Sequence, residues 1–161
     1  MKHPILILVL LLCASCIQNN KDKVLVNSEV KSKLETGWYF LNTNQVKFSR
    51  KLYKSEELYE IEAKPIVNAK HVIYMEKYKS DYGDIGLGIQ LNKKGTEIWK
   101  NATSYAYQRS IQLGLVIDDT LVYAVDLRAP IETGESALNR GDLTLKELQR
   151  FEKKIKTARS K

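Results

Sequence analysis

Three places in this sequence combine residue types and positions that could support covalent or acid–base chemistry. Two cysteines, Cys13 and Cys16, stand near the start of the chain. His71 precedes a short apolar run, and the adjacent carboxylates of Asp118 and Asp119 separate two segments of alternating apolar residues. A thiolate can act as a nucleophile, a histidine can bind a metal or transfer a proton, and paired carboxylates can serve as acid and base.

The sequence lacks the partners that catalysis at these places requires. His71 has no second histidine at a spacing typical of a zinc site, and no Gly-x-Ser-x-Gly motif supplies a serine nucleophile. The Gly86-Leu87-Gly88 stretch lacks the third glycine of a dinucleotide-binding loop. Aspartate is favoured in turns, so we expect Asp118 and Asp119 to form a solvated hairpin turn. The sequence therefore predicts a protein that is not an enzyme and binds no cofactor or metal.

The start of the chain is typical of an export signal. It begins Met1-Lys2-His3-Pro4, continues with an apolar run over residues 5–12, and then has small residues ahead of Cys16. A charged start, a short apolar run and small residues before a cleavage site are the parts of a signal peptide. The run is far shorter than the ~20 residues that span a bilayer. The alternative is a buried N-terminal helix or strand; we expect residues 1–15 to be a signal peptide.

The stretch Leu12-Cys13-Ala14-Ser15-Cys16 resembles the lipobox of bacterial lipoproteins. In that family the cysteine after two small residues receives a diacylglyceryl group and becomes the mature N-terminus. Cys13 stands where the family usually has leucine, whereas Ala14 and Ser15 match. The resemblance implies lipid attachment at Cys16, palmitate-type acyl chains, and a membrane-anchored place in the bacterial cell envelope outside the cytoplasm. Two acyl chains hold a protein stably to a membrane.

Positive charge is concentrated at the end of the chain. The sequence has 161 residues and a formal charge of +7, and residues 146–161 hold seven basic side chains against two acidic ones. Cations near the C-terminus of a helix are favoured by about 0.3–1 kcal/mol each. We therefore expect a solvated helix face rather than a site for a polyanion. A location outside the cytoplasm also argues against nucleic acid as a partner.

The length is that of one compact domain, preceded by a polar segment. We expect a polar tether at 16–34, an N-terminal strand segment at 35–62 and the main domain at 63–158. Short apolar runs predict strands at 37–41 and 72–75, and alternating apolar residues predict strands at 85–91, 111–117 and 121–127. With two helices, this order predicts an α+β fold, in which two helices pack on one face of a mainly antiparallel sheet in two layers.

Two features of the central region have local structural consequences. Gly86 and Gly88 alternate with apolar residues, which predicts a close neighbour or a bulge on the face of the strand that lacks side chains. Asn92 can cap a helix that runs to about Tyr107. Its apolar stripe is expected at Ile98, Ala102 and Ala106, widened by Trp99.

The last helix has the strongest signals in the sequence. Thr144 and Glu147 have the spacing of a capping box, and Leu143 and Leu148 that of a hydrophobic staple. The helix then presents an apolar stripe, which consists of Leu148, Phe151 and Ile155.

The nine tyrosines are many for this length and offer the most plausible binding feature. Two groups stand out: Tyr74, Tyr78 and Tyr82 beside Lys77 and Lys79, and Tyr105 with Tyr107. Tyrosine and lysine side chains can hold an extended peptide through ring contacts and hydrogen bonds. The alternative is that these rings are half-buried at sheet edges, because strands are rich in tyrosine.

An ordered set of stretches across residues 63–155 matches a known family. These stretches are 64–72, 89–99, 102–103, 115–119, 122–124, 129–134 and 142–148. Together they resemble the head part of the first large periplasmic domain of SecD and SecDF, accessory subunits of the bacterial Sec export machinery. The chain departs from the family at Ala124-Val125, where Ala-Pro is usual, and at 138–141, which is one residue longer. No segments match the family's transmembrane helices, so we expect a head without its proton-driven part.

The resemblance implies a function in protein export. In that family the head is thought to hold emerging preproteins, so we expect an extracytoplasmic lipoprotein that binds polypeptide segments, with Sec translocon components as possible partners. The alternative is a structural or adaptor lipoprotein that docks one specific envelope protein, because a fold does not carry its function with it. A third option is an enzyme or small-ligand binder whose pocket the sequence does not reveal.

Overall fold

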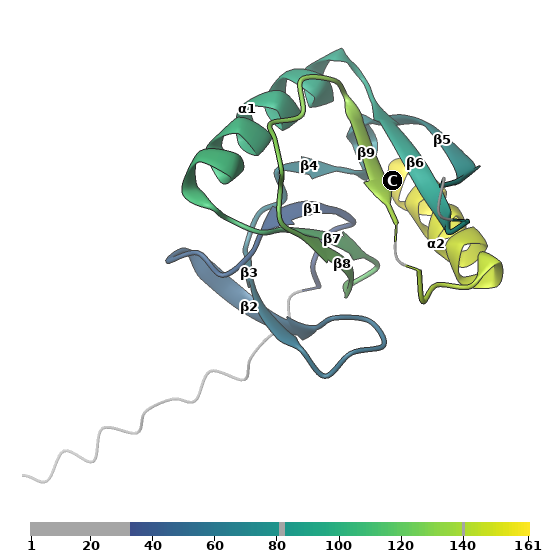
Figure 1. The fold of residues 1–161 in the computed structure, drawn as a ribbon, viewed down its shortest axis with the longest axis horizontal. Helices are drawn as coiled ribbons and strands as arrows, with labels where there is room; N and C mark the ends of the chain where they lie inside the picture. Colours follow the sequence, from purple (N-terminus) through teal and green to yellow (C-terminus); the bar gives the residue numbers. More distant parts are fainter. Residues whose placement is uncertain (1–32, 81–82, 140) are drawn as a thin grey trace, which may run out of the picture. The chain divides into compact units, whose positions relative to one another are not determined.

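The computed structural model describes residues 33–80, 83–139 and 141–161. The expected signal peptide at 1–15, the expected lipid attachment site at Cys16 and most of the expected tether lie outside the described residues. The elements, in chain order (Figure 1), are β1 (Gly37–Phe40), β2 (Val46–Lys51), β3 (Leu58–Glu62), β4 (Val67–Asn68), the short 3₁₀ helix η1 (Ala69–His71), β5 (Val72–Lys79), β6 (Ile85–Leu91), α1 (Lys93–Arg109), β7 (Leu113–Ile117), β8 (Thr120–Val125), β9 (Glu135–Leu138) and α2 (Leu145–Arg159).

The described strands form three antiparallel sheets. The central sheet has the order β4-β1-β7-β8, β2 and β3 form a hairpin, and β5-β6-β9 form the third sheet. The predicted α+β class with antiparallel strands is confirmed. The strands are shared among three sheets, whereas the sequence predicted one, because alternation identifies a strand but not its partner. Strand β1 pairs with β7, so the segment expected at 35–62 is joined directly to the domain expected at 63–158.

The central sheet is covered on both faces. Trp38 of β1 and Leu115 of β7 belong to the larger apolar core, whereas their neighbours Tyr39 and Val116 belong to a second core shared with the β2–β3 hairpin. Successive side chains of a strand point to opposite faces, so β1 and β7 each contribute to both cores. All five residues of β7 are buried in consequence. The alternating pattern at 111–117 predicted one buried face. The second buried face was not recognised, because the glycine at position 114 has no side chain to continue an apolar pattern there.

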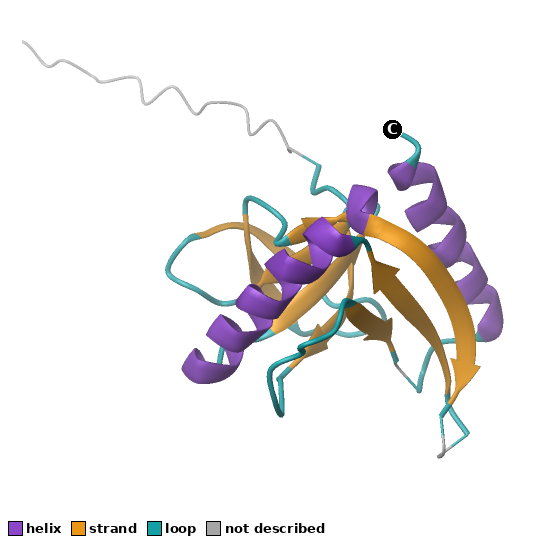
Figure 2. Cartoon of the chain, turned by 90° about the horizontal axis from the view of Figure 1, so that it is seen from above, coloured by secondary structure: helices purple, strands orange, loops and turns teal. Residues whose placement is uncertain are grey.

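Both helices lie on the same face of the central sheet, as predicted. Trp99 of α1 and Leu148, Phe151 and Ile155 of α2 all belong to the larger core, and the second core contains no helix residue. The helices can be followed in Figure 2, where they are purple and the strands orange. The indole rings of Trp38 and Trp99 pack with their centroids 5.2 Å apart, which links α1 to β1.

Helix α1 begins as predicted, but its buried stripe is rotated. The side chain of Asn92 accepts a hydrogen bond from the amide of Gly95 at 2.8 Å. Ile98 and Ala102, which the apolar pattern placed in the core, are only partly buried. Thr103 is polar but fully buried. Its burial is tolerated because the hydroxyl group accepts a hydrogen bond from the amide of Ile131 at 3.0 Å. The buried positions of α1 are Gly95, Trp99, Thr103 and Ala106.

Helix α2 has the predicted cap and the predicted stripe. Thr144 Oγ1 accepts from the amide of Glu147 at 3.3 Å, and the carboxylate of Glu147 accepts from the amide of Thr144 at 2.8 Å. These bonds satisfy donors that would otherwise be unpaired at the helix N-terminus. Leu148, Phe151 and Ile155 are all buried.

The close approach of β4 to β1 leaves no space for a side chain at Gly37. A Cβ atom there would lie 2.3 Å from the carbonyl oxygen of Val67, which the pairing of the two strands holds in place. We expect Gly37→Ala to lower the free energy of unfolding by about 2 kcal/mol or more, because overpacking typically costs 1–3 kcal/mol.

Gly88→Ala is the matched control for this prediction, since a Cβ atom at Gly88 would meet its neighbours at 3.6 Å, an ordinary contact distance. We expect a change within about 0.5 kcal/mol. Urea unfolding of both variants measures the difference. Equal stabilities for the two variants would contradict the close approach at Gly37.

Candidate functional site

Asp118 and Asp119 form the predicted hairpin turn between β7 and β8. Both residues have positive φ, 51° and 66°, as in the two-residue turns that match the twist of paired strands. The pairing of Ile117 with Thr120 closes the hairpin directly beside them.

The two carboxylates are paired with cations from other elements, whereas the sequence predicted a solvated tip. Asp118 Oδ2 accepts a hydrogen bond from Lys154 Nζ of α2 at 2.7 Å, and its other oxygen pairs with Lys33. Asp119 Oδ1 accepts from Arg50 Nη2 of β2 at 2.7 Å and from the amide of Leu34 at 3.0 Å. The carboxylates stay partly exposed, as predicted, with side-chain exposures of 39% and 35%. Their cationic partners were not predicted, because the segment before β1, strand β2 and helix α2 all converge on this turn.

These contacts keep Asp118 ionised. Hydrogen bonds from Lys154 and Lys33 lower the pKa of Asp118 from 3.8 to about 2. The same ion pair raises the pKa of Lys33. A carboxylate with so low a pKa does not donate a proton at neutral pH. The arrangement supports a structural function for the turn.

His71 also has a structural place. Its Nδ1 accepts a hydrogen bond from the amide of Asn68 at 3.3 Å, and it completes the capping box of η1. Among the described residues, no group of three or more histidine, cysteine or carboxylate side chains is arranged to hold a metal ion.

Tyr74 and Tyr78 of the first tyrosine group lie together on one face of the third sheet. Leu87 and Ile89 of β6 belong to the larger core, so Gly86 and Gly88 lie on the opposite face. Tyr78 pairs with Gly86 across the strands, and its ring covers the glycine so closely that a Cβ atom there would lie 2.5 Å from Cζ. The predicted close neighbour of the glycines is confirmed. Partial burial raises the pKa of Tyr78.

This face is hollowed into a groove of about 490 Å³, which we call the tyrosine groove. Its lining includes Tyr74 and Tyr78 of β5, Gly88 of β6, and Ile131 and Thr133, which precede β9. Tyr74 is 57% exposed although it lies within a strand. The groove thus presents aromatic surface to solvent beside a glycine, which has no side chain.

The strand that carries these tyrosines is the edge of its sheet. Strand β5 pairs with β6 on one side, and no described strand pairs with it on the other. Arg159 covers only its start, by donating to the carbonyl oxygen of Ile73 at 3.1 Å. An edge strand with unpaired backbone groups can accept a further strand.

The remaining tyrosines singled out in the sequence do not join this groove. Tyr105 and Tyr107 lie on α1, 44% and 46% exposed. The ring of Tyr105 packs against Phe40 and lies under the guanidinium of Arg109. Tyr82 lies outside the described residues.

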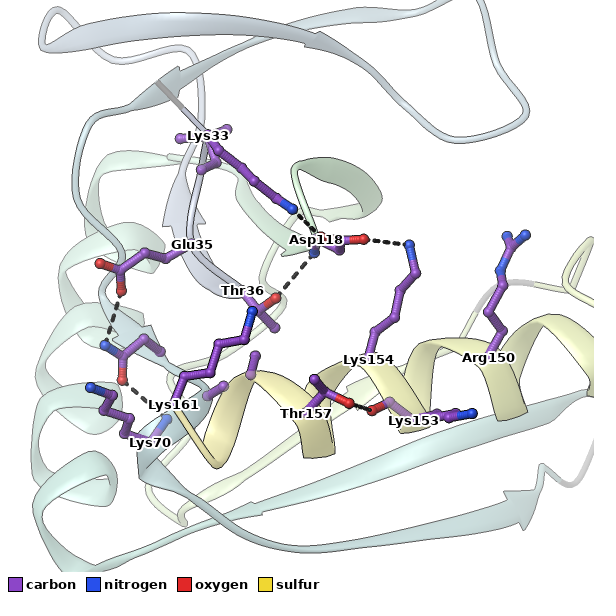
Figure 3. A pocket seen from close by; sticks show the side chains of 14 residues that line it. Lys33, Glu35, Thr36, Lys70, Asp118, Arg150, Lys153, Lys154, Thr157 and Lys161 are labelled. Carbon is purple, nitrogen blue, oxygen red and sulfur yellow. Dashed lines mark hydrogen bonds and ion pairs between the residues drawn. The ribbon is translucent and has the colours of Figure 1, made fainter. Parts of the chain in front are cut away.

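A second hollow, of about 650 Å³, lies between the segment before β1, the η1 helix and the second half of α2 (Figure 3). We call it the basic groove. The sequence predicted a solvated face for the cations of α2 and carried no signal that connects Lys33 and Lys70 with them. These two residues are distant from α2 in the chain, so no local pattern connects them with it. The basic side chains that line the groove are Lys33, Lys70, Arg150, Lys153, Lys154 and Lys161.

Within the described part of the chain, no helix has the length and apolar character needed to cross a membrane. No family model matches the sequence, and no curated protein matches it. The chain is, however, similar in structure to solved structures, among them two of SecDF. The first is described as the crystal structure of SecDF in a super-membrane-facing form, with a TM-score of 0.57 and 13% identity over 77% of this chain.

The domain has a SecDF-like fold. The second similar structure is described as a membrane component SecDF that enhances protein export, with a TM-score of 0.56 and 14% identity over 80% of this chain. The present chain covers 18% of the first SecDF chain and 64% of the second, so it corresponds to a part of each. The fold expected from the sequence resemblance is confirmed.

The ion pairs of Asp118 lead to a prediction about stability. Asp118→Asn keeps the turn, because asparagine adopts positive φ readily, but removes the charge that faces Lys154 and Lys33. We expect the free energy of unfolding at neutral pH to fall by about 0.5–1 kcal/mol, since the pairs are partly exposed. Urea unfolding measures this loss.

The loss should depend on pH. The pKa of Asp118 is lowered by folding from 3.8 to about 2, so its stabilising contribution is present above pH ~4 and disappears as the pH falls towards 2. Wild type and Asp118→Asn should therefore converge in acid. Glu60→Gln, at an exposed carboxylate of β3, is the control. Equal effects of the two substitutions at neutral pH would contradict the special position of Asp118.

Proposed function

We propose that this protein is an extracytoplasmic lipoprotein that binds extended polypeptide segments and acts in protein export. The edge strand β5 carries the proposal. It has an unpaired side among the described residues, and its tyrosines line the tyrosine groove. A polypeptide binds here as an added strand, with its backbone on β5 and its side chains towards the groove.

The geometry of β5 favours recognition of the backbone rather than of a sequence. Strand addition uses main-chain hydrogen bonds, which every polypeptide except at proline can form. Strand β5 has eight residues, a length of about 26 Å at 3.3 Å per residue. Arg159 already occupies the carbonyl oxygens of Val72 and Ile73, which leaves the rest of the strand, from Tyr74 to its end, for a partner.

The chemistry of the groove fits segments of mixed composition. The rings of Tyr74 and Tyr78 offer apolar surface with a polar hydroxyl at one end, and Gly88 leaves space for a side chain of the partner. Glu76, on the same face, adds a carboxylate beside them. Unfolded polypeptides present both apolar and polar side chains, and this groove has contacts for each.

Location and fold agree with this function. The lipobox-like stretch that ends at Cys16 implies an anchor on the outer side of a membrane, where exported chains emerge unfolded. One of the similar structures is described as a membrane component that enhances protein export. The alternative function is that of an adaptor which docks one envelope protein at the same edge, and the experiments below distinguish the two.

Photo-crosslinking in cells tests the binding of polypeptides. A crosslinking amino acid replaces Tyr74 in the groove or Tyr107 on α1, two tyrosines of similar exposure. We expect crosslinks from position 74 to many exported proteins and few from position 107, identified by mass spectrometry. A single recurrent protein at position 74 would favour the adaptor, and equal capture from both positions would contradict the proposed site.

A variant that fills the groove provides the complementary test. Gly88→Val adds a side chain between Glu76 and Tyr78 without removing any existing group. We expect capture from position 74 to fall about tenfold, whereas Gly88→Ala reduces it less, because tight binding sites are sensitive to added volume. Unchanged capture by Gly88→Val, with its fold verified by circular dichroism, would contradict binding in the groove.

The lipid anchor is tested by metabolic labelling with a radioactive fatty acid. We expect Cys16→Ser to abolish labelling, because Cys16 is the proposed acceptor of the lipid. We also expect no lipid-anchored mature protein in the membrane fraction of this variant. Cys13→Ser is the matched control and should be labelled like wild type. Labelling of Cys16→Ser, or its loss in Cys13→Ser alone, would place the lipid elsewhere.

A further inference from the structure

The basic groove has an excess of positive charge that the fold does not neutralise. Six basic side chains line it, against the two carboxylates of Glu35 and Asp118. The carboxylate of Asp118 is already paired with Lys33 and Lys154. Glu35 accepts a hydrogen bond from the side-chain amide of Asn68 at 3.2 Å. The acidic groups of the groove are therefore occupied by partners within the domain.

Three lysines remain without a carboxylate partner in the part of the chain that the structure describes. They are Lys70 of η1, Lys153 of α2 and Lys161, which follows α2. Figure 3 shows that the side chains of Lys70 and Lys161 lie at one end of the groove, and those of Arg150 and Lys153 along α2. Like charges that line one hollow from separate elements repel one another, and an anion placed among them relieves the repulsion.

The helix dipole explains only part of this arrangement. Cations are favoured near the C-terminus of a helix, which accounts for Lys161, two residues after the end of α2. Lys153 and Arg150, however, lie about two turns or more before the end of α2 at Arg159, and Lys70 belongs to another element. The dipole does not require these three to face one hollow.

The floor of the groove is apolar. Leu34, Ala69 and Ala158 contribute to its lining beneath the cationic side chains. An apolar floor with a cationic rim suits an amphiphilic anion better than a free inorganic ion, because the apolar part of the ligand covers the floor while its charged group contacts the rim.

We propose that the basic groove binds the phosphate-bearing headgroup of an anionic phospholipid and so seats the domain on the membrane surface. Lys33, the first described residue, lines the groove, and 17 positions separate this lysine from Cys16. A chain of that length spans at most about 60 Å. The proposal thus rests on the proposed lipid anchor at Cys16, which keeps the groove within this distance of the bilayer.

The lipid in the groove provides a second membrane contact, in addition to the lipid anchor at the N-terminus. One acylated terminus holds a protein to the bilayer without fixing its orientation, whereas a basic patch adds an attraction to anionic lipid at a defined face. The basic groove shares no lining residue with the tyrosine groove. A polypeptide on β5 and a lipid beside α2 therefore do not compete for the same side chains.

Hydrogen exchange of the full, lipidated protein in vesicles tests this proposal. The vesicles consist of phosphatidylcholine alone or of phosphatidylcholine mixed with anionic phosphatidylglycerol. Mass spectrometry follows amide exchange in η1 and in the second half of α2. We expect exchange about threefold slower or more when phosphatidylglycerol is present, and we expect high salt to reverse the protection.

Two sets of substitutions distinguish the groove from general attraction of a basic protein to an anionic surface. The triple variant Lys70→Gln, Lys153→Gln and Lys161→Gln should lose the protection. The control variant Lys64→Gln, Lys93→Gln and Lys94→Gln removes the same charge from exposed positions outside the groove and should keep it. Loss of protection in both variants, or protection that does not depend on phosphatidylglycerol, would overturn the proposal.

Two further measurements identify the source of the anionic group and test the lipid anchor independently. Inorganic phosphate or an acidic peptide is added to the phosphatidylcholine vesicles. If either gives the same protection as phosphatidylglycerol, the ligand is not a lipid and the proposal fails. Co-flotation of the protein with phosphatidylcholine vesicles reports on the anchor at Cys16 independently, so failure of the anchor is visible even where the groove binds lipid.

Discussion

The two aspartates of the β7–β8 turn join three segments that are distant in the sequence. Asp119 holds the amide of Leu34 and the guanidinium of Arg50, and Asp118 pairs with Lys33 and Lys154. The chain before β1, the β2–β3 hairpin and helix α2 thus converge on one tight hairpin. Each exposed pair contributes little by itself, but together they fix the direction in which the chain enters the domain and the position of α2 beside it.

The position of the basic groove follows from this arrangement, whereas that of the tyrosine groove follows from the third sheet. Because the turn draws Lys33 and α2 together, the cations of α2 face the start of the described chain and form the basic groove with Lys70. The third sheet, in contrast, contributes one face to the larger core and leaves its other face and the edge of β5 open. The same fold therefore provides a surface suited to a membrane beside the expected anchor and, separately, a strand suited to a polypeptide.

The elements could be predicted from the sequence wherever a local signal specified them. The caps at Asn92 and Thr144, the turn at Asp118 and the glycines facing Tyr78 each depend on neighbours in the chain or across one hairpin. Contacts between distant residues could not be predicted in this way. Thr103 is polar and was missed because its burial depends on the backbone of Ile131.

The candidate sites show the same division. The tyrosines at 74 and 78 could be proposed from composition and strand pattern, but their common groove depends on the pairing of β5, β6 and β9. The basic groove depends on three separate elements, and no sequence pattern connects them.

The most direct test of the account is amide hydrogen exchange of the full chain with and without an unfolded exported protein. Strand addition predicts slower exchange in β5 and unchanged exchange in α1; slowing in α1 with none in β5 would contradict it.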